Sequence, residues 1–244
     1  MMAEFHARHF VPCRARISIV GAIGREQANE MVEQLLASLP SGSSCELLPL
    51  VDEVKPLEQA RRVDIAFESA QAHLFIGQPG IARQHPDYLP LIVGNYVLGG
   101  GGFVSRLTEQ VREKRGLSYS VYSYFSPGLH AGAFTVGLQT RPDQAAQAVD
   151  VATEVLKRFV QEGPTERELQ AAKDNLIGGF ALRLDSNRKL LEQLANIGWN
   201  RLPLNYLDTW SDEVGRVTVA DIRAAFQRVL QPERMVTVIL GAKP

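Results

Sequence analysis

Apolar residues recur along the chain with two different periods, which predict two kinds of element. Alternation of apolar and polar residues is typical of strands. It is found in residues 13–21, 61–69, 72–80, 117–125, 131–140 and 234–241. Apolar residues three and four positions apart are typical of helices. They are found in residues 25–42, 85–99, 103–116, 142–163, 164–184 and 221–230.

The order of these elements predicts the fold class. One pair of strands, residues 117–125 and 131–140, flanks a hairpin signal that contains Pro-Gly. The helices are grouped between the strands, and one of them begins with a capping box from Thr165 to Glu168. We therefore expect an α+β protein with a largely antiparallel sheet covered by helices, and not a doubly wound parallel sheet.

The two ends of the chain carry the same succession of elements. At each end a helical pattern is followed by a proline, then by a strand pattern closed by a glycine. Pro12 and Gly21 are nine residues apart, as are Pro232 and Gly241, and the two copies are 220 residues apart. A chance match of such short units is one explanation. The other, which we favour, is that residues 1–21 end a preceding module and residues 22–244 form one further module.

Composition and charge narrow the class of protein. The 244 residues include 26 basic and 27 acidic side chains, so the net charge of −1 gives no overall field that favours nucleic acid or acidic lipid. No apolar run reaches the roughly 18 residues that span a bilayer, so we expect a soluble chain without a transmembrane segment. Cys13 and Cys45 are too few for a disulfide framework, and we interpret them as small apolar residues.

Two features resemble ligand sites but lack the residues that such sites need. The glycine run at residues 99–102 precedes a helix, as in phosphate-binding loops, but no Lys-Ser or Lys-Thr pair follows it. We expect these glycines to connect two helices through tight backbone angles. His6 and His9 are one helical turn apart, but no third metal ligand accompanies them. We predict no metal site in this chain.

The segment after the glycine run brings two polar groups into one region. Residues 103–116 place Phe103, Leu107 and Val111 on one helical stripe, and a glycine ends the helix. Arg112 lies in the last helical turn, where positive charge also suits the helix dipole. If the next strand runs back along the helix, Tyr119 comes close to Arg112. A guanidinium and a phenol together can donate hydrogen bonds to a carbonyl or an oxyanion, although they cannot cleave a bond by themselves.

The sequence "GGGFVSRLTEQVREKRGLSYSVYSYFSPGLHAGAFTVGLQT", residues 100–140, resembles the C-terminal half of zinc peptidases of the pitrilysin (M16) family. That family includes the mitochondrial processing peptidases and insulin-degrading enzyme. The resemblance extends over nearly the whole chain. It implies a LuxS/M16 peptidase-like α+β fold built from repeated modules, and it accounts for the repeat at the two ends.

The resemblance also implies a division of labour. The catalytic module of the family carries the zinc motif H-x-x-E-H, which none of the five histidines here begins. The other module carries an Arg/Tyr pair seven residues apart that contacts substrate, which corresponds to Arg112 and Tyr119. The resemblance thus implies a chain that is inactive alone and binds a peptide or unfolded polypeptide, while a partner module with H-x-x-E-H holds the zinc. The alternative is a catalytically silent scaffold or assembly subunit of the same family.

Overall fold

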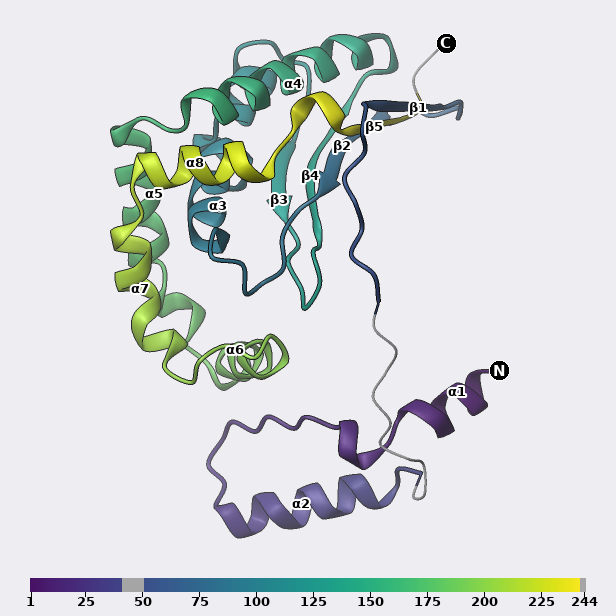
Figure 1. The fold of residues 1–244 in the computed structure, drawn as a ribbon, viewed down its shortest axis with the longest axis vertical. Helices are drawn as coiled ribbons and strands as arrows, with labels where there is room; N and C mark the ends of the chain where they lie inside the picture. Colours follow the sequence, from purple (N-terminus) through teal and green to yellow (C-terminus); the bar gives the residue numbers. More distant parts are fainter. Residues whose placement is uncertain (41–50, 242–244) are drawn as a thin grey trace. The chain divides into compact units, whose positions relative to one another are not determined.

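The computed structural model describes residues 1–40 and 51–241, and the chain divides into two compact units (Figure 1). Unit 1 comprises Met1–Asp52 and Gly179–Tyr206. Unit 2 comprises Glu53–Gly178 and Leu207–Pro244, and it contains both Arg112 and Tyr119.

Unit 2 is built on one five-stranded sheet. The strands are β1 (Arg61–Ile65), β2 (Ala72–Pro79), β3 (Val121–Phe125), β4 (Ala133–Thr140) and β5 (Val236–Leu240). Their order in the sheet is β1-β5-β2-β4-β3. Only the pair of β1 with β5 is parallel, and the other neighbouring pairs are antiparallel. This topology confirms the prediction of an α+β fold with a largely antiparallel sheet.

Helices cover one face of this sheet. The α-helices of unit 2 are α3 (Tyr88–Asn95), α4 (Ala145–Glu162), α5 (Glu166–Gly178), α7 (Tyr206–Arg216) and α8 (Val219–Val229). Shorter helical turns are η2 (Tyr96–Gly100), η3 (Gly102–Val104), η4 (Thr108–Glu113), η5 (Pro142–Gln144) and η7 (Pro232–Arg234). Helix α4 packs against β2 and β4, and α3 packs against β3 and α8 (Figure 1).

The core of unit 2 lies between the sheet and these helices. Alternation along β2 buries Leu74 and Ile76, whereas Phe75 between them is 42% exposed on the opposite face. Phe159 of α4 and Phe226 of α8 are fully buried, with their ring centroids 4.8 Å apart in an edge-to-face arrangement. One face of the sheet therefore carries the core, and the other face is left open over its central strands.

Unit 1 is helical in its described residues. Its elements are α1 (Met2–His9), η1 (Pro12–Arg14), α2 (Arg25–Ala37), η6 (Ala181–Arg183) and α6 (Asn187–Trp199). The strand predicted over residues 13–21 is not formed, because among the described residues no strand lies beside it to share a hydrogen-bond ladder. Arg16 in this segment instead donates to the carbonyls of Gly198 and Trp199, where a cation suits the C-terminus of α6.

The two ends of the chain remain comparable in part. A helix is followed at each end by a short 3-10 turn that begins at proline, η1 at Pro12 and η7 at Pro232. The module boundary at residue 21 stays a prediction. The interpretation of the two cysteines as small apolar residues stays a prediction. One of them, Cys45, lies outside the described residues.

An ion pair joins the segment after the glycine run to α5. Arg106 donates from Nε and Nη2 to the two carboxylate oxygens of Glu168, both at 2.7 Å. The backbone N–H and the hydroxyl of Thr165 also donate to Glu168, which confirms the capping box. Burial opposes ionisation of Glu168, but the hydrogen bonds from Arg106 and Thr165 outweigh it and lower its pKa from 4.5 to about 2.

This pKa predicts a loss of stability in acid. A carboxylate whose pKa is lower in the folded state stabilises the fold above its unfolded pKa and loses that contribution as the pH falls through the folded pKa. Between pH 4.5 and 2 we expect the free energy of unfolding to fall by about 1–2 kcal/mol more in the native protein than in Glu168→Gln, after allowance for solvent screening. Denaturant titrations across this pH range measure the difference. Equal pH slopes in the two proteins would contradict the assignment.

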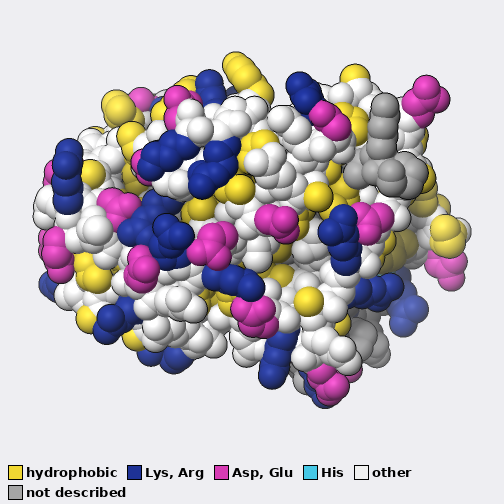
Figure 2. Space-filling view, turned by 90° about the horizontal axis from the view of Figure 1, so that it is seen from above, with side chains coloured by type: hydrophobic (Ala, Val, Ile, Leu, Met, Phe, Trp, Pro, Cys, Tyr) yellow, Lys and Arg dark blue, Asp and Glu magenta, His cyan; other side chains and the backbone are white. Residues whose placement is uncertain are grey.

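Charges of both signs are mixed over the surface. On the face drawn in Figure 2, basic and acidic side chains lie interspersed, as the net charge of −1 suggests. Among the described residues, no helix is long and apolar enough to cross a bilayer.

Candidate functional site

The glycine run connects α3 to the segment that carries the candidate residues. The π-helical turn η2 continues α3, and Gly102 then adopts a φ of +62°. A Cβ at Gly99 would lie 2.4 Å from Oγ and 2.6 Å from the backbone nitrogen of Ser123 on β3. The prediction of tight backbone angles is thus confirmed at Gly102. At Gly99 the requirement is space, because the turn lies directly against a strand.

A buried polar pair fastens this turn to the sheet. Asn95 donates from Nδ2 to the carbonyl of Ser123 at 2.9 Å, and the Ser123 hydroxyl donates back to Asn95 Oδ1 at 2.6 Å. Both side chains are buried. Because a buried polar group is costly without a partner, this reciprocal pair fixes the position of η2 beside β3.

The predicted helix over residues 103–116 is broken into two pieces. Ser105 has extended backbone angles and its hydroxyl donates to the carbonyl of Gly102 at 2.8 Å, so η3 ends there. Leu107 and Val111 are fully buried, as predicted. Phe103 is 72% exposed, so its placement on the same apolar stripe was wrong. It precedes the break and does not share the helical phase of the other two.

Arg112 lies between two aromatic rings. Its guanidinium carbon is 4.6 Å from the ring centroid of Phe103 and 5.0 Å from that of Tyr119. Its Nε also lies 3.3 Å from a carboxylate oxygen of Glu113, and its side chain is 28% exposed. Contact with two rings helps to hold the guanidinium in place, and the exposed part of the side chain can still donate hydrogen bonds. Arg112 and Tyr119 therefore converge, as the sequence predicted.

The other two basic residues of this turn face their own helix. Lys114 pairs with Glu109 at 2.7 Å. Arg115 donates to the carbonyl of Gln110 at 2.8 Å and to its side-chain oxygen at 3.0 Å. These contacts are consistent with cations that stabilise the end of a helix. The sequence allowed the same role for Arg112.

Tyr119 lies before the strand and not within it. The helical segment ends at Gly116 with a φ of +60°, as predicted. The chain then turns, with the Ser118 hydroxyl donating to the carbonyl of Ser120 at 2.5 Å, and β3 begins only at Val121. The strand predicted over residues 117–125 is therefore shorter than expected and does not include Tyr119. Val121 is buried, whereas Tyr119 is 82% exposed.

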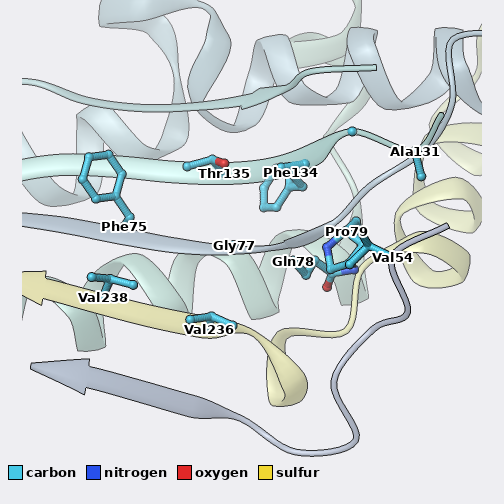
Figure 3. Close-up of a pocket in the computed structure, with 12 residues that line it drawn as sticks. Val54, Phe75, Gly77, Gln78, Pro79, Ala131, Phe134, Thr135, Val236 and Val238 are labelled. Atoms are coloured by element: carbon cyan, nitrogen blue, oxygen red, sulfur yellow. The ribbon is translucent and has the colours of Figure 1, made fainter. Parts of the chain in front are cut away.

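A separate apolar pocket of about 500 Å³ lies on the open face of the sheet (Figure 3). It is lined by residues of β2, β4 and β5, among them Phe75, Pro79, Thr135, Val236 and Val238. Neither Arg112 nor Tyr119 lines it. The pocket is lined mainly by apolar side chains, few of which could take part in a reaction. The Arg/Tyr pair therefore remains the candidate site.

The segment before β1 is fastened at one side of this pocket. Glu53 accepts a hydrogen bond from the backbone N–H of Ala131 at 2.9 Å, and its other oxygen lies 2.8 Å from Nδ1 of His130. These hydrogen bonds, first with Ala131 and then with His130, lower the pKa of Glu53. Its neighbour Val54 lines the pocket. No local pattern predicted this contact, since the two segments are 77 residues apart.

Metal ligands do not cluster in the described part of the chain. No group of three or more His, Cys, Asp or Glu side chains there is arranged to hold an ion. Structural and catalytic zinc sites need three or four protein ligands. We therefore expect the isolated chain to lose zinc on dialysis, which metal analysis of the dialysed protein measures. Retention of one zinc per chain would overturn this prediction.

Comparison with known sequences identifies the family. The model of the peptidase M16 inactive domain matches residues 1–176. An uncharacterised zinc protease of Streptomyces coelicolor is 30% identical over 244 residues, which cover 97% of this chain and 52% of that protein. A non-peptidase homolog of Helicobacter pylori is 31% identical over 206 residues, which cover 83% of this chain and 46% of that protein.

Comparison with solved structures agrees. The crystal structure of a peptidase M16 inactive domain from Pseudomonas fluorescens matches with a TM-score of 0.90 and 34% identity, over 100% of this chain and 57% of that one. A protease from Helicobacter pylori shares the fold at a TM-score of 0.86 and 19% identity, over 100% of this chain and 58% of that one. The chain spans about half the length of the curated relatives it matches. It belongs to the peptidase M16 family, in which it corresponds to the inactive domain.

Proposed function

We propose that this chain is the substrate-binding, non-catalytic half of an M16-type zinc metallopeptidase. Arg112 and Tyr119 contact the peptide near the cleaved bond, while a separate module with the H-x-x-E-H motif holds zinc. Zinc held by that motif would supply the Lewis acid that activates water for attack on the peptide carbonyl. The names of several relatives, which describe zinc proteases, support a peptidase as the whole protein, and the match to the inactive-domain model supports a non-catalytic role for this chain.

The arrangement of Arg112 carries the proposal. Besides its ion pair with Glu113, its guanidinium carbon lies 4.6 and 5.0 Å from the ring centroids of Phe103 and Tyr119. The contacts described for Lys114 and Arg115 are with polar groups of their own helix. Stabilising a helix end requires only the positive charge of Arg112. That role does not explain the two exposed aromatic side chains beside it. A restrained guanidinium beside a phenol hydroxyl offers two kinds of donor to one carbonyl oxygen.

A peptide in this site is expected to be extended. An extended backbone leaves its carbonyls available to donors from the side, and the zinc-bearing module supplies an edge strand for its remaining backbone groups. In this geometry Arg112 and Tyr119 act as donors to the carbonyl and to the oxyanion that forms from it. Neither residue serves as acid, base or metal ligand.

The second candidate function is a scaffold or assembly subunit without a role in catalysis. The name of the Helicobacter pylori relative, a non-peptidase homolog, favours it. The two functions are distinguished by replacing Arg112 and Tyr119 in the assembled peptidase and measuring both assembly and peptide cleavage. Slow cleavage by a normally assembled variant supports the substrate-binding function. Unchanged cleavage supports the scaffold.

A further inference from the structure

The turn that follows the glycine run places exposed apolar side chains beside Arg112. Phe103 is 72% exposed and Val104 is 76% exposed. Tyr119, whose ring also lies close to the Arg112 guanidinium, is 82% exposed. Large apolar side chains left uncovered next to a restrained polar group are typical of ligand sites, where apolar contact adds affinity and polar groups fix orientation.

The fold holds Phe103 in this exposed position from both sides. Before it, Gly102 has a φ of +62°, and a Cβ at Gly101 would lie 2.6 Å from the carbonyl oxygen of Tyr96. After it, the Ser105 hydroxyl bonds to both the Gly102 carbonyl and the Thr108 hydroxyl, at 2.8 and 3.0 Å. The exposure of Phe103 therefore follows from a turn that is fixed at its two ends.

The position of Phe103 relative to the polar pair defines what it can contact. One part of its ring meets the Arg112 guanidinium, and the exposed remainder faces away from the core. A peptide whose carbonyl accepts hydrogen bonds from Arg112 carries its adjacent side chain only a few ångströms from that carbonyl, since consecutive Cα atoms are about 3.8 Å apart. That side chain is within reach of the Phe103 ring.

We propose that Phe103 determines specificity in this site: it contacts the substrate side chain next to the carbonyl that Arg112 and Tyr119 bind, and it selects apolar and aromatic side chains there. This inference rests on the function proposed above. An uncharged aromatic surface gains from contact with an apolar side chain and offers nothing to a carboxylate. Aspartate or glutamate at this substrate position is expected to be disfavoured.

The experiment uses the complete peptidase, with this chain and its zinc-bearing module together. Two series of peptides are used, one varied at the residue before the cleaved bond and one at the residue after it. In each series the varied residue is Phe, Leu, Ala or Asp. The native enzyme is expected to prefer Leu or Phe over Ala by about tenfold in kcat/KM, the discrimination that an apolar contact of this size provides. Phe103→Ala is expected to reduce this preference to about twofold or less, mainly through KM, whereas Phe103→Leu retains most of it.

The control is Phe67→Ala, which removes another exposed phenylalanine of unit 2, 64% exposed and not in contact with Arg112. It should leave the preference unchanged. A native preference that survives in Phe103→Ala would overturn the inference, as would an equal slowing of all four peptides. If the proposed substrate-binding function itself is wrong, the result is different: peptidases that carry Arg112→Ala or Tyr119→Phe then cleave every peptide at the native rate.

Discussion

Replacing Arg112 with alanine is expected to slow peptide cleavage by the assembled peptidase by about 10²–10³, and so is replacing Tyr119 with phenylalanine. The loss of one donor directed at a developing oxyanion typically costs about 3–4 kcal/mol of transition-state stabilisation. The effect should appear mainly in kcat, because the donors act more strongly on the charge of the transition state than on the neutral carbonyl.

The structure makes Tyr119→Phe the sharper of the two changes. The phenylalanine keeps the ring on which the Arg112 guanidinium stacks and removes only the hydroxyl. A loss of turnover in this variant is therefore attributable to the missing donor. Arg112→Lys is a useful companion, because it keeps the charge and loses the planar, forked donor.

Arg115→Ala is the matched control. Arg115 is a cation of the same turn whose contacts are confined to Gln110. Its removal should cost only a few tenths of a kcal/mol and leave turnover close to native. Normal assembly is checked in each variant by gel filtration of the complex. If Arg112→Ala and Tyr119→Phe assembled and turned over peptide at the native rate, the scaffold function would replace the one proposed here.

The fold class and the convergence of Arg112 with Tyr119 followed from local patterns. Alternation predicted all five strands of the sheet, and along β2 and β3 it corresponds to one buried face. The glycine at residue 116 was sufficient to predict a reversal after the helix, which brings Tyr119 back toward Arg112. Both inferences depend on residues close together in the chain.

The role of Phe103 did not follow from the same pattern. Four-residue spacing placed it with Leu107 and Val111, but spacing assumes one continuous helix, and Ser105 interrupts it. Formation of π-helical turns likewise depends on contacts with distant segments, here the buried pair of Asn95 with Ser123. The position of Phe103 directly after four glycines was the one available signal.

The ends of elements and the long-range contacts were the least accessible to prediction. The strand expected over residues 13–21 satisfied the alternation rule, yet a strand also needs a neighbour, which the pattern does not report. The pairing of Glu53 with His130 joins segments 77 residues apart. Only the folded chain brings them together, so no local pattern could have predicted the contact.

Replacing Gly99 with alanine is expected to be among the most destabilising single-methyl changes in unit 2. The new Cβ would lie within 2.4–2.7 Å of Ser123 Oγ, the Ser123 backbone nitrogen and Leu107 Cδ1. A side-chain end can rotate away, but the strand backbone cannot move without disturbing the pairing of β3 with β4. Displacing η2 instead would break the hydrogen bonds between Asn95 and Ser123, leaving buried polar groups unpaired.

We expect a loss of at least about 2–3 kcal/mol in the free energy of unfolding of Gly99→Ala, from overpacking together with the weakened polar pair. Gly215→Ala is the matched control, because Gly215 lies in helix α7 and a Cβ there would meet no atom within 4 Å. That change should raise stability by about 0.5–1 kcal/mol, as alanine favours helix over glycine. Urea titrations of the two variants measure both effects. Equal stabilities would show that η2 moves freely against β3, and the explanation of the glycine run as a close backbone contact would then be wrong.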